Sequence, residues 1–142
     1  MTMNNPESAE FRRVSDRWLL VAAVLGGLGV ALGAFGAHGL RTMLASVADA
    51  EQRLSWWETG ARYHLIHALA CALAAWSHER SEGARSARVA SALFVVGTSV
   101  FAGTLYAMAL GAPRWLGAIT PLGGVSLIAG WIALAISARR AR

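Results

Sequence analysis

Three of the four histidines lie near the ends of long apolar segments, where their side chains would reach one depth of a membrane. His38 ends the first apolar segment, and His64 and His67 stand near the start of the second, three residues apart and therefore on one face of a helix. Imidazole is the commonest metal ligand and titrates near neutral pH. With four further residues, these histidines form a predicted outward-facing polar pocket in the outer half of the membrane domain: His38, Tyr63, His64, His67, Tyr106, Thr120 and Pro121.

Polar side chains inside a bilayer are costly, so this gathering requires a reason, and four interpretations stay open. The histidines can be structural, each donating a hydrogen bond to a neighbouring helix. They can ligate haem or a metal, line a pocket for a small molecule, quinone or lipid head group, or conduct protons or ions. Conduction is disfavoured because the inner half of the predicted spans has almost no polar groups. The spacing matches no metal-site or hydrolase motif, so we predict no catalytic residue, no metal ligand and no cofactor.

The elements that must position these residues follow from the distribution of charge. The 142 residues are 56% hydrophobic and 15% charged, whereas soluble domains have about 25% charged residues. Long uncharged runs are typical of helices that cross the hydrocarbon core, which takes about 20 residues. We therefore predict an all-α integral membrane protein, a four-helix bundle with spans at residues 18–40, 58–78, 89–111 and 115–138. A polar tail, residues 1–17, precedes this membrane domain of residues 18–138, and a basic tail, residues 139–142, follows it.

The basic residues indicate orientation rather than a nucleic-acid partner. All thirteen are arginines, and nine of them lie in three short clusters: the N-terminal tail, the connection between the second and third spans, and the C-terminal tail. The positive-inside rule then places both termini in the cytoplasm. The net charge of +5 comes from arginines clustered at the ends of the predicted spans. This distribution is typical of membrane topology and excludes a continuous phosphate-binding face. The single cysteine, Cys71, permits no intramolecular disulfide.

Small residues recur at helical spacing in three of the predicted spans. In lipid, close backbone approach along such residues drives helix association, because lipid tails are as apolar as leucine. We expect these residues to pack helices together: Gly26, Gly29, Gly33 and Gly36 in the first span, Ser99 and Gly103 in the third, and Gly123 and Gly130 in the fourth. The number of such stripes leaves room for a homo-oligomer.

Two local features refine the predicted helices. Residues 41–62 are expected to form an amphipathic extension that lies in the interface or runs into the second span, with Asp49 as its N-cap and Gln52 as the partner in a capping box. Pro121 is expected to interrupt and kink the fourth span near its outer end, because it removes a helix hydrogen bond.

Four blocks of the sequence resemble a known family. They are Gly-Ala-Phe-Gly-Ala-His-Gly-Leu at residues 33–40, Trp-Glu-Thr-Gly at 57–60 with Tyr63 and residues 67–70, Gly-Thr-Leu-Tyr at 103–106, and Ile-Thr-Pro-Leu-Gly-Gly at 119–124 with residues 130–131. Their order is similar to that of the YgdD/YwdK-like proteins, domain-of-unknown-function family 423, whose animal relative is transmembrane protein 256. The resemblance covers residues 18–136.

The resemblance implies a four-span protein of the plasma membrane with no established activity, and it supplies no catalytic residue. Of the pocket residues, all but His64 match the family's blocks. We therefore expect a non-enzymatic protein of a bacterial inner membrane that contacts the lipid bilayer and acts through lipid or membrane-protein partners. The alternatives are a His-ligated haem or metal redox protein and a small transporter or channel subunit.

Overall fold

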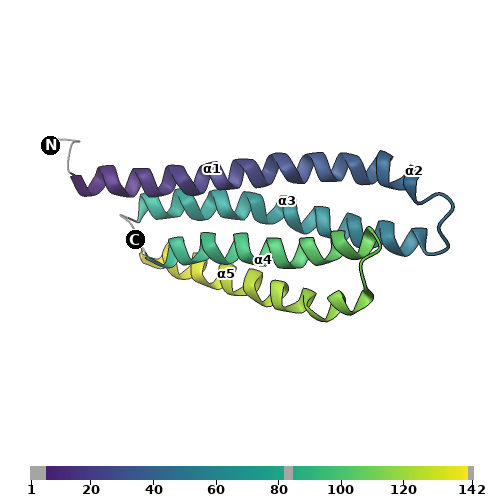
Figure 1. Cartoon of the computed structure of the whole chain (residues 1–142). Helices are drawn as coiled ribbons and strands as arrows, with labels where there is room; N and C mark the ends of the chain where they lie inside the picture. The colour runs from purple at the N-terminus through teal and green to yellow at the C-terminus, as the bar shows by residue number, and fades with distance from the viewer. Residues whose placement is uncertain (1–5, 82–84, 141–142) are drawn as a thin grey trace.

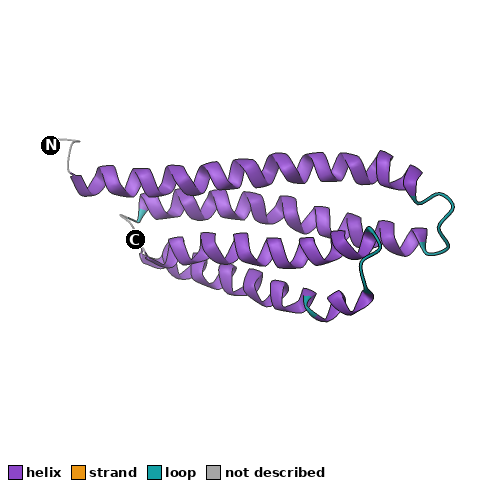
Figure 2. Cartoon of the chain, viewed as in Figure 1, coloured by secondary structure: helices purple, strands orange, loops and turns teal. Residues whose placement is uncertain are grey.

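The structure, a computed structural model, describes residues 6–81 and 85–140, and throughout these residues it is helical with short connections (Figures 1 and 2). The long helices are α1 (Pro6–Phe35), α3 (Ala50–Arg80), α4 (Arg85–Ala109) and α5 (Thr120–Arg140). Three short elements join them: the π-helix η1 (Gly36–Leu40), α2 (Arg41–Met43) and the 3₁₀ helix η2 (Arg114–Ala118). The all-α prediction is confirmed, and the fold is a four-helix bundle.

The four long helices lie side by side and alternate in direction (Figure 1). The extensive contacts are between neighbours in chain order: α1 with α3, α3 with α4, and α4 with α5. α1 and α5 therefore form the two edges of the array. Both termini lie at one end, here called the tail end, and the connections after α2 and after α4 lie at the other, the loop end.

The first helix is longer than the predicted span. α1 begins at Pro6 and continues through η1 and α2 to Met43, so residues 6–17 of the predicted tail are helical, and residues 1–5 lie outside the described part. Proline fits the first turn of a helix, where its missing N–H is not needed. The polar start is held to the bundle by Ser15, whose buried hydroxyl donates to the Ala75 carbonyl of α3 at 3.1 Å.

Residues 50–62 of the predicted amphipathic extension are the first turns of α3. Asp49 stands at the N-cap position, but its side chain makes no capping hydrogen bond, so the capping box with Gln52 is not formed. The carboxylate instead accepts hydrogen bonds from Arg53 at 2.8 Å and from Arg114 of η2 at 3.0 Å. Two guanidinium donors replace the backbone amides as its partners.

The connection between α4 and α5 corrects the predicted kink. α4 ends at Ala109, and the turn that follows contains Gly111, whose φ of +104° favours glycine; the Ala112 amide donates back to the Ala107 carbonyl at 2.9 Å. After η2, α5 starts at Thr120. Pro121 therefore lies in the first turn of a helix, where no N–H partner is required, and not within a continuous span. The fourth predicted span is therefore interrupted near its outer end, as expected, but the interruption is the step from η2 to α5 at Ile119 and not a hydrogen bond lost at Pro121.

Two hydrophobic clusters fill the bundle, and small residues predominate in the first of them. The tail-end cluster packs alanines of α3 and α4 around Cys71, Phe94 and Leu127. The loop-end cluster joins Leu40, Leu44, Trp57 and Ala109. Alanine at the contacts lets the helix backbones approach closely, as expected for association in lipid.

Within the described part of the chain, three helical stretches are long and apolar enough to cross a membrane: Ala9–Met43, Arg85–Ala109 and Arg114–Arg139. They match the first, third and fourth predicted spans. α3 falls outside this group because arginine, glutamate and histidine interrupt it. The most polar long helix therefore lies between two apolar ones, α1 and α4.

Candidate functional site

The buried histidines of α3 occupy the centre of the molecule. His64 and His67 are 7% and 5% exposed. The His64 ring centroid lies 6.2 Å from that of Tyr106 on α4, and the His67 ring centroid lies 6.2 Å from that of Trp131 on α5. Because lipid cannot satisfy a polar group, α3 must turn these side chains towards protein. The predicted shared face of His64 and His67 therefore lies inside the bundle rather than at an open surface.

His67 joins α3 to α5 through both ring nitrogens. Its Nδ1 lies 2.8 Å from the Tyr63 carbonyl oxygen, and the indole Nε1–H of Trp131 donates to its Nε2 at 3.3 Å. A carbonyl only accepts and an indole N–H only donates, so the neutral Nδ1–H tautomer fits both bonds. Its ring also lies near that of Phe94. With both nitrogens engaged, His67 has no free lone pair for a metal.

His64 faces two helices and is less completely satisfied. The hydroxyl of Tyr106 on α4 lies 3.4 Å from its Nδ1. Its Nε2 is buried, faces the backbone of Leu25 on α1, and makes no hydrogen bond of good geometry with any described residue. Tyr106 also packs against Trp57, with ring centroids 4.5 Å apart. His64 and Tyr106 thus form one polar contact between α1, α3 and α4.

Thr120 pairs with a residue that the sequence analysis did not single out. Its hydroxyl lies 2.8 Å from that of Thr104 on α4, and the Thr104 hydroxyl also bonds to the Val100 carbonyl at 2.8 Å. This contact fixes the start of α5 against α4. The Gly-Thr-Leu-Tyr block contains Thr104, so its place beside the Thr120-Pro121 block was a usable signal.

His38 does not join the other histidines. Its side chain is exposed on η1, where its carbonyl accepts a hydrogen bond from Thr42 at 3.0 Å. Gly29 and Gly36 face α3, and His38 is nine residues from Gly29, or roughly 180° around a helix. The predicted gathering of all three histidines is therefore not found. Pro121 and Tyr63 are also exposed, so the seven predicted residues do not enclose a single pocket.

The tail-end half contains buried polar groups that the sequence analysis missed. Ser77 of α3 and Ser137 of α5 lie 2.9 Å apart, hydroxyl to hydroxyl, and both are buried. Ser91, Thr98 and His78 are buried as well. The expectation that this half has almost no polar groups was wrong, because single serines and threonines in apolar runs gave no periodic signal.

The predicted packing glycines divide into two groups. A Cβ at Gly29 would lie 2.8 Å from Leu65, and Gly36 is in closer contact with Trp57. On α5, a Cβ would lie 2.5 Å from the Phe101 backbone nitrogen at Gly123 and 2.7 Å from the Phe94 ring at Gly130. These four glycines give close helix contacts within one chain.

The other predicted packing residues do not contact a second helix of this chain. A Cβ at Gly26, Gly33 or Gly103 would meet no described atom within 4 Å, and Ser99 is exposed with its hydroxyl on the Val95 carbonyl. On α4 the close approach is made instead by Gly97, where a Cβ would lie 2.5 Å from Leu127. Gly97 lies on the buried face with Phe94 and Phe101, roughly 120° from Gly103.

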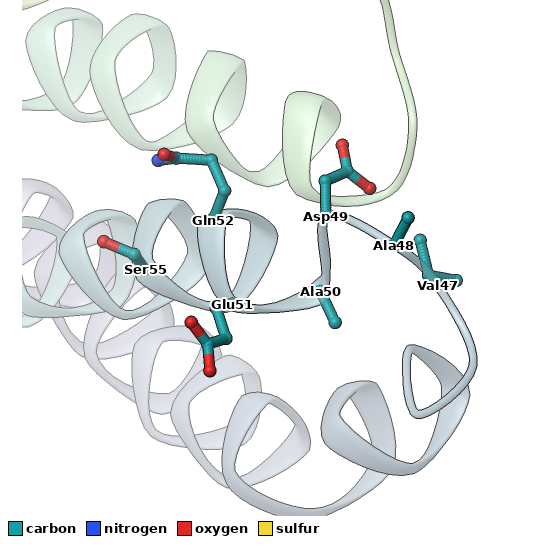
Figure 3. A pocket seen from close by; sticks show the side chains of 7 residues that line it. All are labelled: Val47, Ala48, Asp49, Ala50, Glu51, Gln52 and Ser55. Carbon is teal, nitrogen blue, oxygen red and sulfur yellow. The ribbon is translucent and has the colours of Figure 1, made fainter.

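A polar hollow at the loop end is lined by one segment, residues 47–52 and Ser55, and has a volume of about 590 Å³. Figure 3 shows Asp49 and Gln52 pointing towards α4 and the connection after it, and Glu51 pointing away. The Arg114 guanidinium hydrogen-bonded to Asp49 holds the pKa of that carboxyl below its usual range. Arg114 also stacks over Trp56, 5.7 Å from the ring centroid. These contacts tie the connection before α3 to the one before α5.

Among the residues described, no group of three His, Cys, Asp or Glu side chains lies close enough together to hold a metal ion. The arrangement around His64 and His67 supports hydrogen bonding and aromatic packing between helices. It favours the structural interpretation of these two histidines.

The comparisons with known proteins agree with the resemblance. Residues 32–124 match the family described as protein of unknown function DUF423. The chain is 37% identical over 121 residues to the UPF0382 membrane protein YwdK of Bacillus subtilis, covering 85% of this chain and 94% of that protein. It is 35% identical over 134 residues to the UPF0382 inner membrane protein YgdD of Escherichia coli K12, covering 89% and 93%.

A similar match, 38% identity over 122 residues, is made to a UPF0382 membrane protein of Haemophilus influenzae and covers 86% of this chain and 93% of that protein. Among solved structures, none matches the chain.

Proposed function

The chain belongs to the DUF423 family of membrane proteins, and from this premise we propose that it is a non-enzymatic protein of a bacterial inner membrane that acts through lipid or membrane-protein partners. The observation that supports this most directly is the unequal burial of its helices. In the most apolar window of the α1 stretch only 17% of residues are buried, against 39% for α4. α1 thus offers a long surface that this chain leaves uncovered.

The proposal includes four membrane crossings. α3 lies against α1 on one side and α4 on the other and has a similar length, so it crosses the bilayer wherever they do. Its buried polar side chains, among them His64, His67 and Ser77, are tolerated because neighbouring helices cover them. The connections after α1 and α4 then lie on one side of the membrane, and both termini lie on the other.

The arginine distribution sets the direction. Arg12, Arg13 and Arg17 lie at the tail end with Arg80, Arg85 and Arg88, so this end faces the cytoplasm. A cytoplasmic reporter fused after residue 142 should be active and a periplasmic reporter inactive. An active periplasmic reporter there would overturn the orientation.

The interior argues against chemistry at the histidines. His67 uses both nitrogens in hydrogen bonds to the Tyr63 carbonyl and Trp131. What remains of the predicted outward pocket is the contact between His64 and Tyr106, where one buried nitrogen could meet a polar ligand. A visible spectrum with metal analysis tests the redox alternative: gently purified protein should be colourless, and a Soret band or stoichiometric metal would contradict the proposal.

Buried polar groups at both ends favour a second candidate, a small transporter or channel subunit. Thr120 lies at the loop end, His64 and His67 lie near the middle of α3, and Ser77 and Ser137 lie towards the tail end. A pathway across a membrane needs polar groups through its whole depth. Ion or proton flux in liposomes, lost in the His67→Phe variant, would support this candidate, and a flat trace would exclude it.

Site-specific photocrosslinking in bacterial membranes tests the leading proposal. The probes are exposed residues of the two edge helices, Leu20, Val24 and Leu28 on α1 and Val125, Ile128 and Ile132 on α5. If α1 serves partners, its positions should give discrete protein or lipid adducts that the α5 positions lack. Equal, diffuse labelling of both edges would contradict a partner surface on α1.

A further inference from the structure

An apolar groove runs along the outside of the bundle between α1 and α3. Its volume is about 600 Å³, and its lining is nonpolar, from Leu19 to Val30 on α1 and from Leu65 to Ala72 on α3. Two glycines, Gly26 and Gly27, keep it open, because a Cβ at either would meet no described atom within 4 Å. Larger side chains at these positions would fill the groove.

The length of the groove matches one leaflet of a bilayer. From Leu19 to Val30 the α1 axis rises by roughly 16 Å, at about 1.5 Å per residue. The hydrocarbon core is about 30 Å thick, so one leaflet occupies about half of it. A partner helix would use the whole thickness, whereas a single acyl chain uses one leaflet. The groove therefore has the depth of an acyl chain that enters from the tail end.

The groove opens at the tail end onto a polar mouth. Leu19 also lines a smaller cavity of about 130 Å³, together with Asp16, Trp76 and Glu79. The Arg80 guanidinium lies 5.0 Å from the centroid of the Trp76 ring. The mouth thus offers two carboxylates and a guanidinium beside an aromatic ring of the kind found at membrane interfaces.

We propose that the groove and its mouth hold one amine-bearing phospholipid of the phosphatidylethanolamine type, from the leaflet at the tail end. One of its two acyl chains fills the groove and the other stays in the bilayer, its ammonium lies at Asp16 and Glu79, and its phosphate lies near Arg80. The inference rests on the proposed function only in taking the bundle to cross a membrane.

Two physical effects contribute to lipid binding: packing of the acyl chain in the groove and charge pairing at the mouth. An empty groove lacks dispersion contacts, and a flexible acyl chain restores them. All lipid tails are as apolar as the groove, so these contacts do not select one lipid over another. Selection comes from the mouth. A lipid with phosphate and no amine, such as phosphatidylglycerol, would also place its phosphate near Arg80, but it would bring no cation to the carboxylates of Asp16 and Glu79.

Lipid binding to the delipidated full-length protein in detergent tests the mouth. Native mass spectrometry counts bound phosphatidylethanolamine and phosphatidylglycerol with matched acyl chains. We expect one tightly held lipid and a preference of at least about threefold for the ethanolamine lipid, the scale of exposed ion pairs. The Asp16→Asn, Glu79→Gln double variant should lose the preference. Glu10→Gln is the control, since Glu10 is at the same end but lines a different hollow with Arg13, Val14 and Arg17.

A pair of glycine variants tests the groove. Gly26→Leu places a side chain inside it, and Gly33→Leu places one in equally open space outside it. Gly26→Leu should weaken retention of phosphatidylethanolamine at least about threefold through lost packing, and Gly33→Leu should not. Thermal unfolding of both variants verifies that they fold.

Equal binding of the two lipids by the parent protein, or unchanged retention in Gly26→Leu, would overturn the proposal. So would a homodimer that Gly26→Leu dissociates and Gly33→Leu leaves intact, because the occupant would then be a second copy. The reporter fusions test the crossing of the membrane separately, so failure of the lipid proposal and failure of the topology are distinguishable.

Discussion

The glycines of α1 and α5 look alike in sequence, but Gly26 and Gly33 on α1 stand in surroundings opposite to those of the α5 glycines. On α5, Gly123 and Gly130 lie against Phe101 and Phe94 of α4, closer than any real side chain could. On α1, Gly26 and Gly33 face space that no described atom of this chain enters. The same residue type therefore closes one edge of the bundle and leaves the other open. Spacing alone does not reveal which glycines are already used within the chain.

The largest loss of stability is expected at the closed edge of the bundle, where α5 packs against α4. Gly123→Ala puts a Cβ 2.5 Å from the Phe101 backbone nitrogen, so α4 and α5 must move apart, which costs about 2–3 kcal/mol. Thermal or denaturant unfolding in detergent should show this loss. The alternative close contact, Gly97 with Leu127, lies on the same interface and should respond in the same direction. A fully stable Gly123→Ala protein would mean that the two helices are not packed this closely.

The open edge should respond with the opposite sign. Gly26→Ala and Gly33→Ala meet no steric obstacle in the chain, and alanine is the better helix former by up to about 1 kcal/mol. In the delipidated protein, each variant should unfold at the same or a slightly higher temperature than the parent. Destabilisation of either would show that another molecule already packs against α1, and so would sharpen the contrast between the two edges.

Much of the fold could be predicted because charge marks the ends of membrane helices. The uncharged runs gave the four long helices, and the burial of His64 and His67 follows from their shared face. The faces of the helices were harder to predict. An apolar residue is equally suited to lipid and to the protein interior, so α1 and α5 have little amphipathic pattern from which to read a contact.

Other features depended on local geometry that spacing does not encode. Pro121 lies in the first turn of α5 because η2 ends the connection just before it, at Ala118. The Asp49 carboxylate does not cap α3, because it accepts a hydrogen bond from the guanidinium of Arg114, distant in sequence, at 3.0 Å. His38 is exposed because it lies on the opposite side of the helix from Gly29 and Gly36, which face α3. Each outcome requires the three-dimensional position of a second segment.

A smaller effect is expected from the hydrogen bond between α3 and α5 inside the closed region. Trp131→Phe keeps a ring beside Phe94 but removes the indole N–H that donates to His67 at 3.3 Å. Interhelical hydrogen bonds in membranes average about 0.6 kcal/mol, so the unfolding temperature should fall by roughly 2 °C. Trp115→Phe is the control, because Trp115 is 64% exposed. Equal shifts of the unfolding temperature in the two variants would show that the hydrogen bond from Trp131 to His67 does not stabilise the fold.

The smallest effect is expected at the loop end, where Asp49 in the connection between α2 and α3 contacts Arg114 in the connection between α4 and α5. The Arg114 hydrogen bond lowers the pKa of Asp49 from its usual value of 3.8. A carboxyl whose pKa is lower in the folded state stabilises the fold above its unfolded pKa, and this contribution is lost as the pH falls through the folded pKa. Stability of the parent protein should therefore contain a component that declines below about pH 4, and Asp49→Asn should lack it.

Because Arg114 is largely exposed, salt should weaken the same component. Glu51→Gln is the control at a neighbouring exposed carboxyl, and an identical pH profile for Asp49→Asn and Glu51→Gln would show that the Asp49–Arg114 pair does not link the two connections in solution.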